Sequence, residues 1–81
     1  MSDLENKVDQ ILAQVRAEVL RAVKKHRPIA GPHEGYAVIL EELDELWDEV
    51  KPDRGKSDSA RTEALQVAAM GVRYILDVCG G

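Results

Sequence analysis

The chain has 81 residues, which is enough for one small domain but too few for two separate hydrophobic cores. Apolar residues make up 44% of it and charged residues 32%, a balance typical of a globular protein rather than a disordered one. The net charge of −4 argues against a protein that binds nucleic-acid polymers, since such proteins usually carry a basic face. There is no signal-peptide pattern, no run of about 18 apolar residues and only one cysteine. We therefore expect a cytoplasmic protein that forms one domain, residues 1–81, and does not contact a membrane.

A first helix is predicted from Ser2 to about His26. Ser2 and Glu5 have the Ser-x-x-Glu spacing of a capping box, in which the two side chains satisfy backbone N–H groups of the first turn. Apolar residues follow at intervals of three and four, the spacing of one helix face, at Leu4, Val8, Ile11, Leu12, Val15, Val19, Ala22 and Val23. Pro28 limits the segment, because a proline disfavours helical conformation in the residue before it.

The second predicted helix begins near Pro32, since proline suits the first turn of a helix. It continues to about Val50 and is ended by Pro52. Its apolar side chains fall mainly on one face, which contains Ile39, Leu43, Leu46 and Val50. Residues 51–59 are polar and are expected to form a loop.

The third predicted helix runs from about Ser59 to Val78 and ends at two glycines, a common stop signal. Apolar residues cover nearly its whole circumference, so we expect it to be buried on most sides. Two neighbouring helices cannot surround a third, and exposed apolar surface favours self-association. The predicted fold is therefore all-α, a small antiparallel bundle of three main helices that is completed by dimerisation through the third helices.

Acidic side chains are concentrated on the second predicted helix, where six of the nine residues from 41 to 49 are Asp or Glu. At about 100° per residue, Glu42, Glu45 and Glu49 share a face and Glu41 lies beside them. Residues four apart are neighbours on a helix surface, so this spacing places like charges close together. A divalent cation or a cationic partner that neutralises the charges would explain the arrangement.

Glu63 is the acid of interest on the third predicted helix, because it lies among residues that are expected to be buried. If the second and third helices are antiparallel neighbours, Glu63 approaches Glu45 and Glu49. Carboxylate oxygens that converge from two helices favour a hard cation, with Mg²⁺ as the first expectation and Mn²⁺ as another. Buried carboxylates would be unfavourable without one.

These residues resemble a known signature. Glu41-Glu42-x-x-Glu45, followed after 17 residues by Glu63, is similar to the bipartite EExxE…ExxD motif of the MazG-like superfamily of all-α nucleoside triphosphate pyrophosphohydrolases. The surrounding sequence segments GYAVILEELDEL and EALQVAAM also resemble segments of short MazG-like proteins. The resemblance implies a homodimer or homotetramer that hydrolyses a nucleoside triphosphate to monophosphate and pyrophosphate with Mg²⁺. It further implies that Glu41, Glu42, Glu45 and Glu63 ligate the metal.

One position departs from the motif, because Gln66 stands where the family has Asp. An amide oxygen can ligate Mg²⁺ but cannot act as a general base. Glu49 shares a face with Glu42 and Glu45 and is therefore a further possible ligand, as is Gln66 itself. In an active protein, the carboxylates of Glu42 and Glu45 would be the catalytic groups, one of which positions or deprotonates the attacking water.

Phosphate recognition is expected to come from basic side chains, because the chain has no glycine-rich phosphate-binding loop. Lys51, Arg54 and Lys56 lie between the two acidic helices and are the first candidates for binding phosphate, with Arg61 and Arg73 as further ones. His26 and His33 are interpreted as residues of a helix end or the surface.

Two other hypotheses remain open from the sequence. The chain could be a catalytically inactive MazG-like module that binds nucleotides or forms an oligomeric interaction unit, a reading that Gln66 favours. It could also be a dimeric helical scaffold whose acidic face contacts a basic partner. In that case the acids from Glu41 to Glu49 form a solvated helix face, and Glu63 is simply favoured by the dipole at a helix N-terminus.

Overall fold

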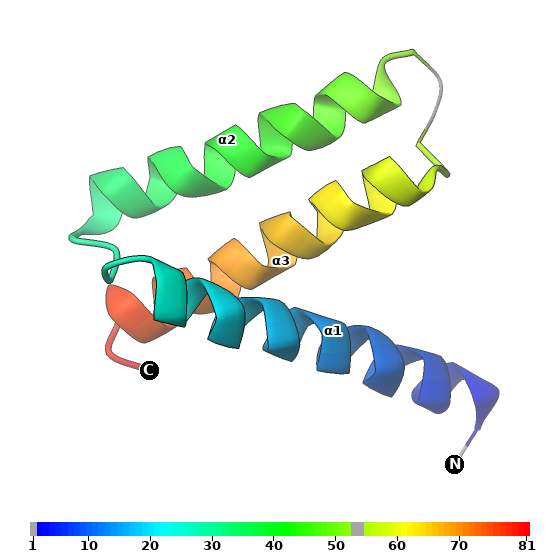
Figure 1. The fold of residues 1–81 in the computed structure, drawn as a ribbon, viewed down its shortest axis with the longest axis horizontal. Helices are drawn as coiled ribbons and strands as arrows, with labels where there is room; N and C mark the ends of the chain where they lie inside the picture. Colours follow the sequence, from blue (N-terminus) through cyan, green and yellow to red (C-terminus); the bar gives the residue numbers. More distant parts are fainter. Residues whose placement is uncertain (1, 53–54) are drawn as a thin grey trace.

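The computed structural model describes residues 2–52 and 55–81, and within these ranges the protein consists of helices without any β-strand. The helices are α1 (Asp3–Lys25), α2 (Pro32–Val50) and α3 (Asp58–Asp77) (Figure 1). The prediction of three helices is confirmed, and each boundary lies within one or two residues of the predicted position. No described helix is long and apolar enough to cross a membrane.

The helix ends follow from the local sequence. Ser2 and Glu5 form the predicted capping box, and α1 is capped at its C-terminal end by His26, whose backbone N–H donates to the carbonyl of Ala22. Pro32 occupies the first turn of α2. The Ser57 side chain accepts a hydrogen bond from the backbone N–H of Ala60, so α3 begins slightly earlier than predicted.

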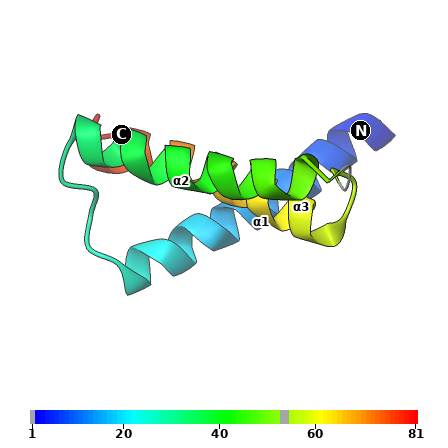
Figure 2. The same cartoon turned by 90° about the horizontal axis from the view of Figure 1, so that it is seen from above.

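The central element is α3, which packs against both of the other helices, whereas α1 and α2 do not pack against each other. In Figure 1, α2 runs antiparallel beside α3, and α1 crosses the C-terminal half of α3 at an angle. Seen from above in Figure 2, α2 overlies α3 and the molecule is thin, with extents of 36 × 35 × 19 Å. The chain therefore forms an open three-helix arrangement in which α1 and α2 are separated.

A small core joins α1 to α3. Val15, Val19 and Ala22 of α1 pack against Ala69 and Met70 of α3, and the partly buried Val38, Ile39 and Leu65 add to this cluster. As expected from the sequence, the two neighbouring helices do not surround α3 within one chain. Its outward apolar side chains remain exposed, namely Val72, Ile75 and Leu76. On α2, Leu43 and Val50 of the apolar face are exposed as well.

The connection between α1 and α2 is held against the C-terminal end of α3. The backbone N–H of Ile29 donates to Oδ2 of Asp77 at 3.0 Å, and Arg73 Nη2 donates to the carbonyl of Arg27 at 3.1 Å. Arg73 and Asp77 also form an ion pair at 3.6 Å, with both side chains nearly buried. The Ile29 side chain is buried as well. These contacts fix where α1 ends and α2 begins.

Candidate functional site

Three carboxylates converge where α2 and α3 lie side by side. Glu42 and Glu45 of α2 and Glu63 of α3 each offer an oxygen, and these oxygens lie within 4.8 Å of one another. The antiparallel pairing of α2 and α3 brings them together, because it places the C-terminal half of α2 beside the N-terminal half of α3. We refer to these residues as the carboxylate triad. The sequence prediction that acids of two helices meet is confirmed for these residues.

Two carboxylates of the triad, those of Glu42 and Glu63, have raised pKa values and are harder to ionise than ordinary glutamates. Burial raises the pKa of Glu42 to about 7, and the adjacent Glu45 adds to the effect, followed by the charges of Glu63 and Glu41. Burial likewise raises the pKa of Glu63, with further contributions from Glu45 and from the charge of Glu49. Without a cation, the protein therefore keeps protons on this site at a pH where exposed carboxylates are ionised.

One oxygen of the triad has no partner among the described residues. Oε2 of Glu63 is buried from solvent and accepts no hydrogen bond. A buried carboxylate oxygen without a donor is unfavourable, so most such groups in folded proteins are satisfied. A cation between the two helices would satisfy it. The donor set consists of carboxylate oxygens, which suits Mg²⁺ or Mn²⁺ better than a metal that prefers sulfur or nitrogen.

The remaining predicted ligands are placed differently. Glu41 is exposed and lines a neighbouring cleft together with Glu42. Glu49 is near enough for its charge to act on Glu63, but it is not one of the triad. The amide Nε2 of Gln66 donates to Oε1 of Glu18 at 2.8 Å, which ties this side chain to α1. Among the described residues, ligand atoms therefore converge in Glu42, Glu45 and Glu63, with Glu41, Glu49 and Gln66 around them.

The predicted phosphate-binding residues lie at the loop that joins α2 to α3. Lys51 caps the end of α2 and forms an ion pair with Asp48 at 3.1 Å. Lys56 is exposed in the same loop, and Arg54 lies outside the described residues. Arg61 is exposed on α3 and lines an apolar groove beside α1. Neither Lys51, Lys56 nor Arg61 lines the cleft next to the triad, whereas Arg73 does.

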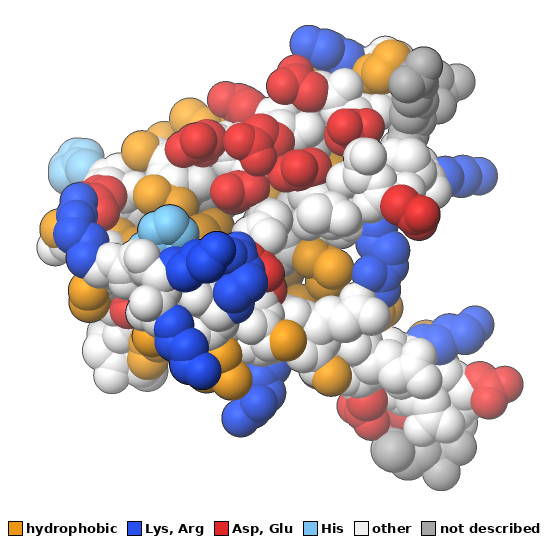
Figure 3. Space-filling model, viewed as in Figure 1, with side chains coloured by type: hydrophobic (Ala, Val, Ile, Leu, Met, Phe, Trp, Pro, Cys, Tyr) orange, Lys and Arg blue, Asp and Glu red, His pale blue; other side chains and the backbone are white. Residues whose placement is uncertain are grey.

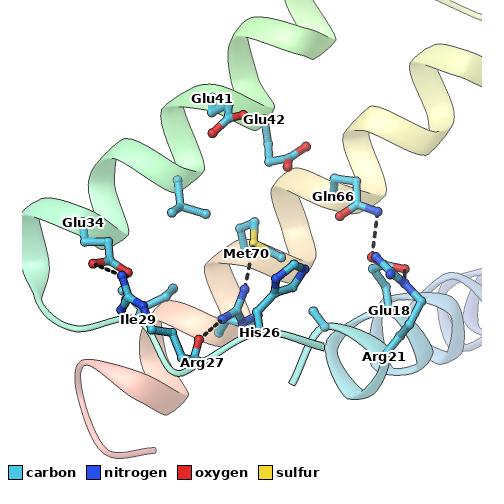
Figure 4. A pocket seen from close by; sticks show the side chains of 13 residues that line it. Glu18, Arg21, His26, Arg27, Ile29, Glu34, Glu41, Glu42, Gln66 and Met70 are labelled. Atoms are coloured by element: carbon cyan, nitrogen blue, oxygen red, sulfur yellow. Dashed lines mark hydrogen bonds and ion pairs between the residues drawn. The ribbon is translucent and has the colours of Figure 1, made fainter. Parts of the chain in front are cut away.

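That cleft lies between α1 and α2, with α3 as its floor, and has a volume of about 420 Å³ (Figure 4). Glu34, Val38, Glu41 and Glu42 of α2 form one wall, and Glu18, Arg21 and Ala22 of α1 form the other. Gln66, Met70 and Arg73 of α3 form the floor, and His26, Arg27 and Ile29 lie at the end where the two helices are connected. The cleft exists because α1 and α2 both pack on α3 and not on each other.

The two walls of the cleft differ in charge. Figure 3 shows acidic side chains gathered along α2 and basic side chains gathered at the C-terminal end of α1. On the α1 wall, Arg21 forms an ion pair with Glu18, and Nε of Arg21 donates to Oε2 of Glu18 at 2.9 Å. This hydrogen bond to Arg21 is the main reason that the pKa of Glu18 is lowered to about 2, and the Gln66 amide adds to it.

Sequence reasoning missed Glu18, Arg21 and His26 as residues of a candidate site. Glu18 and Arg21 are three residues apart on α1, a spacing common in exposed helix pairs, and nothing local distinguishes them from such a pair. Their relation to Gln66 spans 48 positions of the chain and follows only from the crossing of α1 over α3. His26, the residue that caps the C-terminal end of α1, lines the cleft as well.

Comparisons of the chain with models of protein families, with curated proteins and with solved structures found no match.

Proposed function

We propose that the protein is a Mg²⁺-dependent hydrolase that converts a nucleoside triphosphate to monophosphate and pyrophosphate. The observation that supports this most is the convergence of Glu42, Glu45 and Glu63 from two helices, with a buried and unpartnered oxygen on Glu63. The resemblance of these residues to the MazG-like motif supplies the reaction.

In this proposal the chain's own residues hold the cation and prepare the water. Glu42, Glu45 and Glu63 are the metal ligands, and Glu41 and Glu49 supply negative charge beside them. Bound Mg²⁺, or Mn²⁺ in its place, would offset charge on the phosphate oxygens. One carboxylate of the Glu42 and Glu45 pair positions the attacking water and accepts its proton.

A second candidate function is nucleotide binding without turnover. It is favoured by Gln66, which replaces the Asp of the family motif and is already hydrogen-bonded to Glu18 at 2.8 Å. A side chain held in this way supplies neither charge nor a base to the triad. The two candidates share the metal site and differ only in whether product forms.

A second copy of the chain is part of the proposal. The outward apolar side chains of α3 and α1 stay exposed in the single chain, including Ile75, Leu76 and Leu12. Packing of two α3 helices about a twofold axis would cover this surface and complete the bundle. We propose a homodimer, or a homotetramer built from two such dimers, that works in the cytoplasm.

The test is release of pyrophosphate from a panel of nucleoside triphosphates with and without Mg²⁺. We expect Mg²⁺-dependent release that falls at least about 100-fold in Glu45→Gln, because loss of a metal-binding carboxylate removes stabilisation of developing charge. Asp44→Asn is the matched control, since this acid lies on the same helix but outside the triad and the cleft. Nucleotide binding without product would establish the second candidate. Absence of both binding and product would contradict both candidates.

A further inference from the structure

We infer that the cleft between α1 and α2 binds the phosphate groups of a metal–phosphate ligand, and that Arg21 is its main phosphate contact. This assignment rests on the proposed function, because it requires a cation bound at the carboxylate triad. It deepens that function by placing the phosphates against α1, at the opposite side of the triad from the loop that joins α2 to α3.

The floor of the cleft connects the triad to a buried guanidinium. Glu63, Gln66, Met70 and Arg73 are spaced by three, four and three residues, so they follow one face of α3. Glu63 belongs to the triad, and the other three line the cleft. Glu42 belongs to both. A ligand that meets the cation at Glu42 can therefore extend over Gln66 and Met70 toward the connection between α1 and α2.

The charges of the cleft favour a metal-bound anion over a free one. Figure 4 shows Glu41 and Glu42 on the α2 side and Arg21 on the α1 side, with Gln66 and Met70 between them. The two carboxylates would repel a free phosphate, whereas a cation held at Glu42 reverses that effect. At the closed end, Arg27 and Glu34 neutralise each other in an ion pair at 3.1 Å.

Arg21 is held in position before any ligand arrives. Gln66 donates to Glu18, and Glu18 in turn accepts hydrogen bonds from Nε and Nη2 of Arg21. Among the hydrogen bonds of the described residues, Nη1 of Arg21 takes part in none, so it can donate to a ligand oxygen. A guanidinium that is fixed by one carboxylate and still has free donors matches the fork geometry of a phosphate.

Arg73 places a second guanidinium, a buried one, at the floor of the cleft. Its side chain lines the cleft and is 5% exposed, and its Nε has no hydrogen-bond partner among the described residues. Nη2 of Arg73 is occupied by the carbonyl of Arg27, and Nη1 only approaches the Met70 sulfur at 3.7 Å. Asp77 neutralises the charge of Arg73 in an ion pair at 3.6 Å, so Arg73 offers the floor of the cleft an unsatisfied hydrogen-bond donor rather than a free charge.

The experiment measures binding of imidodiphosphate, a non-hydrolysable diphosphate, by calorimetry in excess Mg²⁺. We expect Arg21→Gln to weaken binding about tenfold or more, the usual effect of losing a charge-assisted hydrogen bond. Arg16→Gln is the matched control, since Arg16 is an exposed arginine of α1 that lines a groove on another face. Chelation of Mg²⁺ should abolish binding to the wild-type protein. Arg21 is exposed, so Arg21→Gln should retain the wild-type melting temperature to within a few degrees.

The outcomes separate this inference from the proposed function. Wild-type affinity in Arg21→Gln would overturn the assignment of phosphate binding to the cleft. So would a loss of affinity that is larger in the double variant Lys51→Gln and Lys56→Gln than in Arg21→Gln, which would favour phosphate binding at the loop that joins α2 to α3. Hydrolysis could still proceed in that case. Tenfold weaker binding in Arg21→Gln, without turnover of any triphosphate by the wild-type protein, would support the cleft and contradict the hydrolase. No binding of Mg²⁺-imidodiphosphate to the wild-type protein would overturn the inference.

Discussion

Glu42 links the two features on which the proposals depend, because it belongs to the carboxylate triad and also lines the cleft. Burial and the surrounding carboxylates raise its pKa to about 7. In the unfolded chain the same group has an ordinary glutamate pKa of 4.5. Between these values the folded state binds more protons than the unfolded state, so the free energy of unfolding falls as the pH rises. Negative charge at this position is therefore destabilising until a cation compensates it.

We predict that the metal-free protein melts at a higher temperature at pH 5 than at pH 8. The raised pKa of Glu42 places the loss of stability between its unfolded value and about pH 7. Solvent screening of this partly exposed group limits the effect to about 1–2 kcal/mol. Mg²⁺ should reverse it, because binding to the ionised folded state adds stability above pH 7. Calorimetric or fluorescence melting across this range, with a chelator and with Mg²⁺, measures both effects.

Glu42→Gln should flatten the pH dependence and remove the response to Mg²⁺. Asp44→Asn, a change on the same helix outside the triad, should leave both as in the wild-type protein. A metal-free protein that gains stability from pH 5 to pH 8 would show that the pKa of Glu42 is not raised in the folded state.

Glu18 shifts stability in the opposite sense. Its hydrogen bond with Arg21 lowers its pKa to about 2, so its contribution is present above an unfolded value of 4.5 and is lost as the pH falls toward 2. The loss of stability at acidic pH is therefore expected to come partly from Glu18 on the α1 wall of the cleft. The loss of stability toward neutral pH is expected to come from Glu42 on α2.

At the scale of the helices, the pairing of α2 with α3 depends on a close approach near the N-terminus of α2. Gly35 is buried, and a Cβ atom placed on it would lie 2.6 Å from Cε2 of Tyr74 and also touch Cδ2 of the same ring. Gly71 of α3, in contrast, has no atom within 4 Å of such a Cβ position. The two glycines thus provide a matched pair within helices that are otherwise alike.

We predict opposite effects of the same substitution at these glycines. Gly35→Ala should lower the free energy of unfolding by about 1–2 kcal/mol, because the clash with the Tyr74 ring exceeds the gain in helix propensity. Gly71→Ala should raise it by about 0.5–1 kcal/mol, since alanine favours the helix and meets nothing. Urea unfolding of both variants checks the pair. Equal stabilisation of both would show that α2 and α3 are further apart at this end.

At the scale of the whole molecule, one chain leaves much apolar surface uncovered. α1 and α3 share an outward groove of about 220 Å³ that is lined by Leu12, Leu20 and Val72 among others. A further apolar strip lies on α2, where Trp47 is 57% exposed. Monomeric proteins rarely expose continuous apolar patches of this kind.

We predict that the protein is dimeric at micromolar concentration and that Val72→Lys makes it monomeric. A charge at Val72 would have to be buried if two α3 helices pack together, which is strongly unfavourable. Light scattering coupled to gel filtration measures the mass, and circular dichroism verifies that the variant is folded. Trp47→Lys is the comparison on α2, and it should remain dimeric. If Trp47→Lys is monomeric and Val72→Lys is not, copies associate through α2 and pairing of α3 helices is wrong.

The sequence was sufficient to predict the helices and the triad. The helices follow from local sequence rules, and the triad follows once α2 and α3 are assumed to be antiparallel neighbours. Capping by Ser2 and Glu5, the prolines at 28, 32 and 52, and the helical spacing of apolar residues set the boundaries. The meeting of Glu63 with Glu45 requires only that consecutive helices lie side by side.

The cleft could not be obtained in the same way. Its shape depends on the angle at which α1 crosses α3 and on the separation of α1 from α2, neither of which has a local signal. Arg21 and Glu18 look like an ordinary surface pair until Gln66 is found beside them. The apolar faces of α2 and α3 follow from periodicity, but periodicity alone does not tell whether the surface that covers such a face belongs to the same chain.

The way the interhelical connection is fastened has a consequence for how α1 behaves. Contacts of Ile29 with Asp77 and of Arg27 with Arg73 anchor its C-terminal end, and its buried residues begin only at Val15. The preceding turns of α1 project beyond the rest of the molecule in Figure 1, so this helix is held only at its C-terminal end. Thermal fraying should therefore start at Ser2 and stop near Val15, so that the half of α1 facing the cleft keeps its shape while the other half unwinds and re-forms.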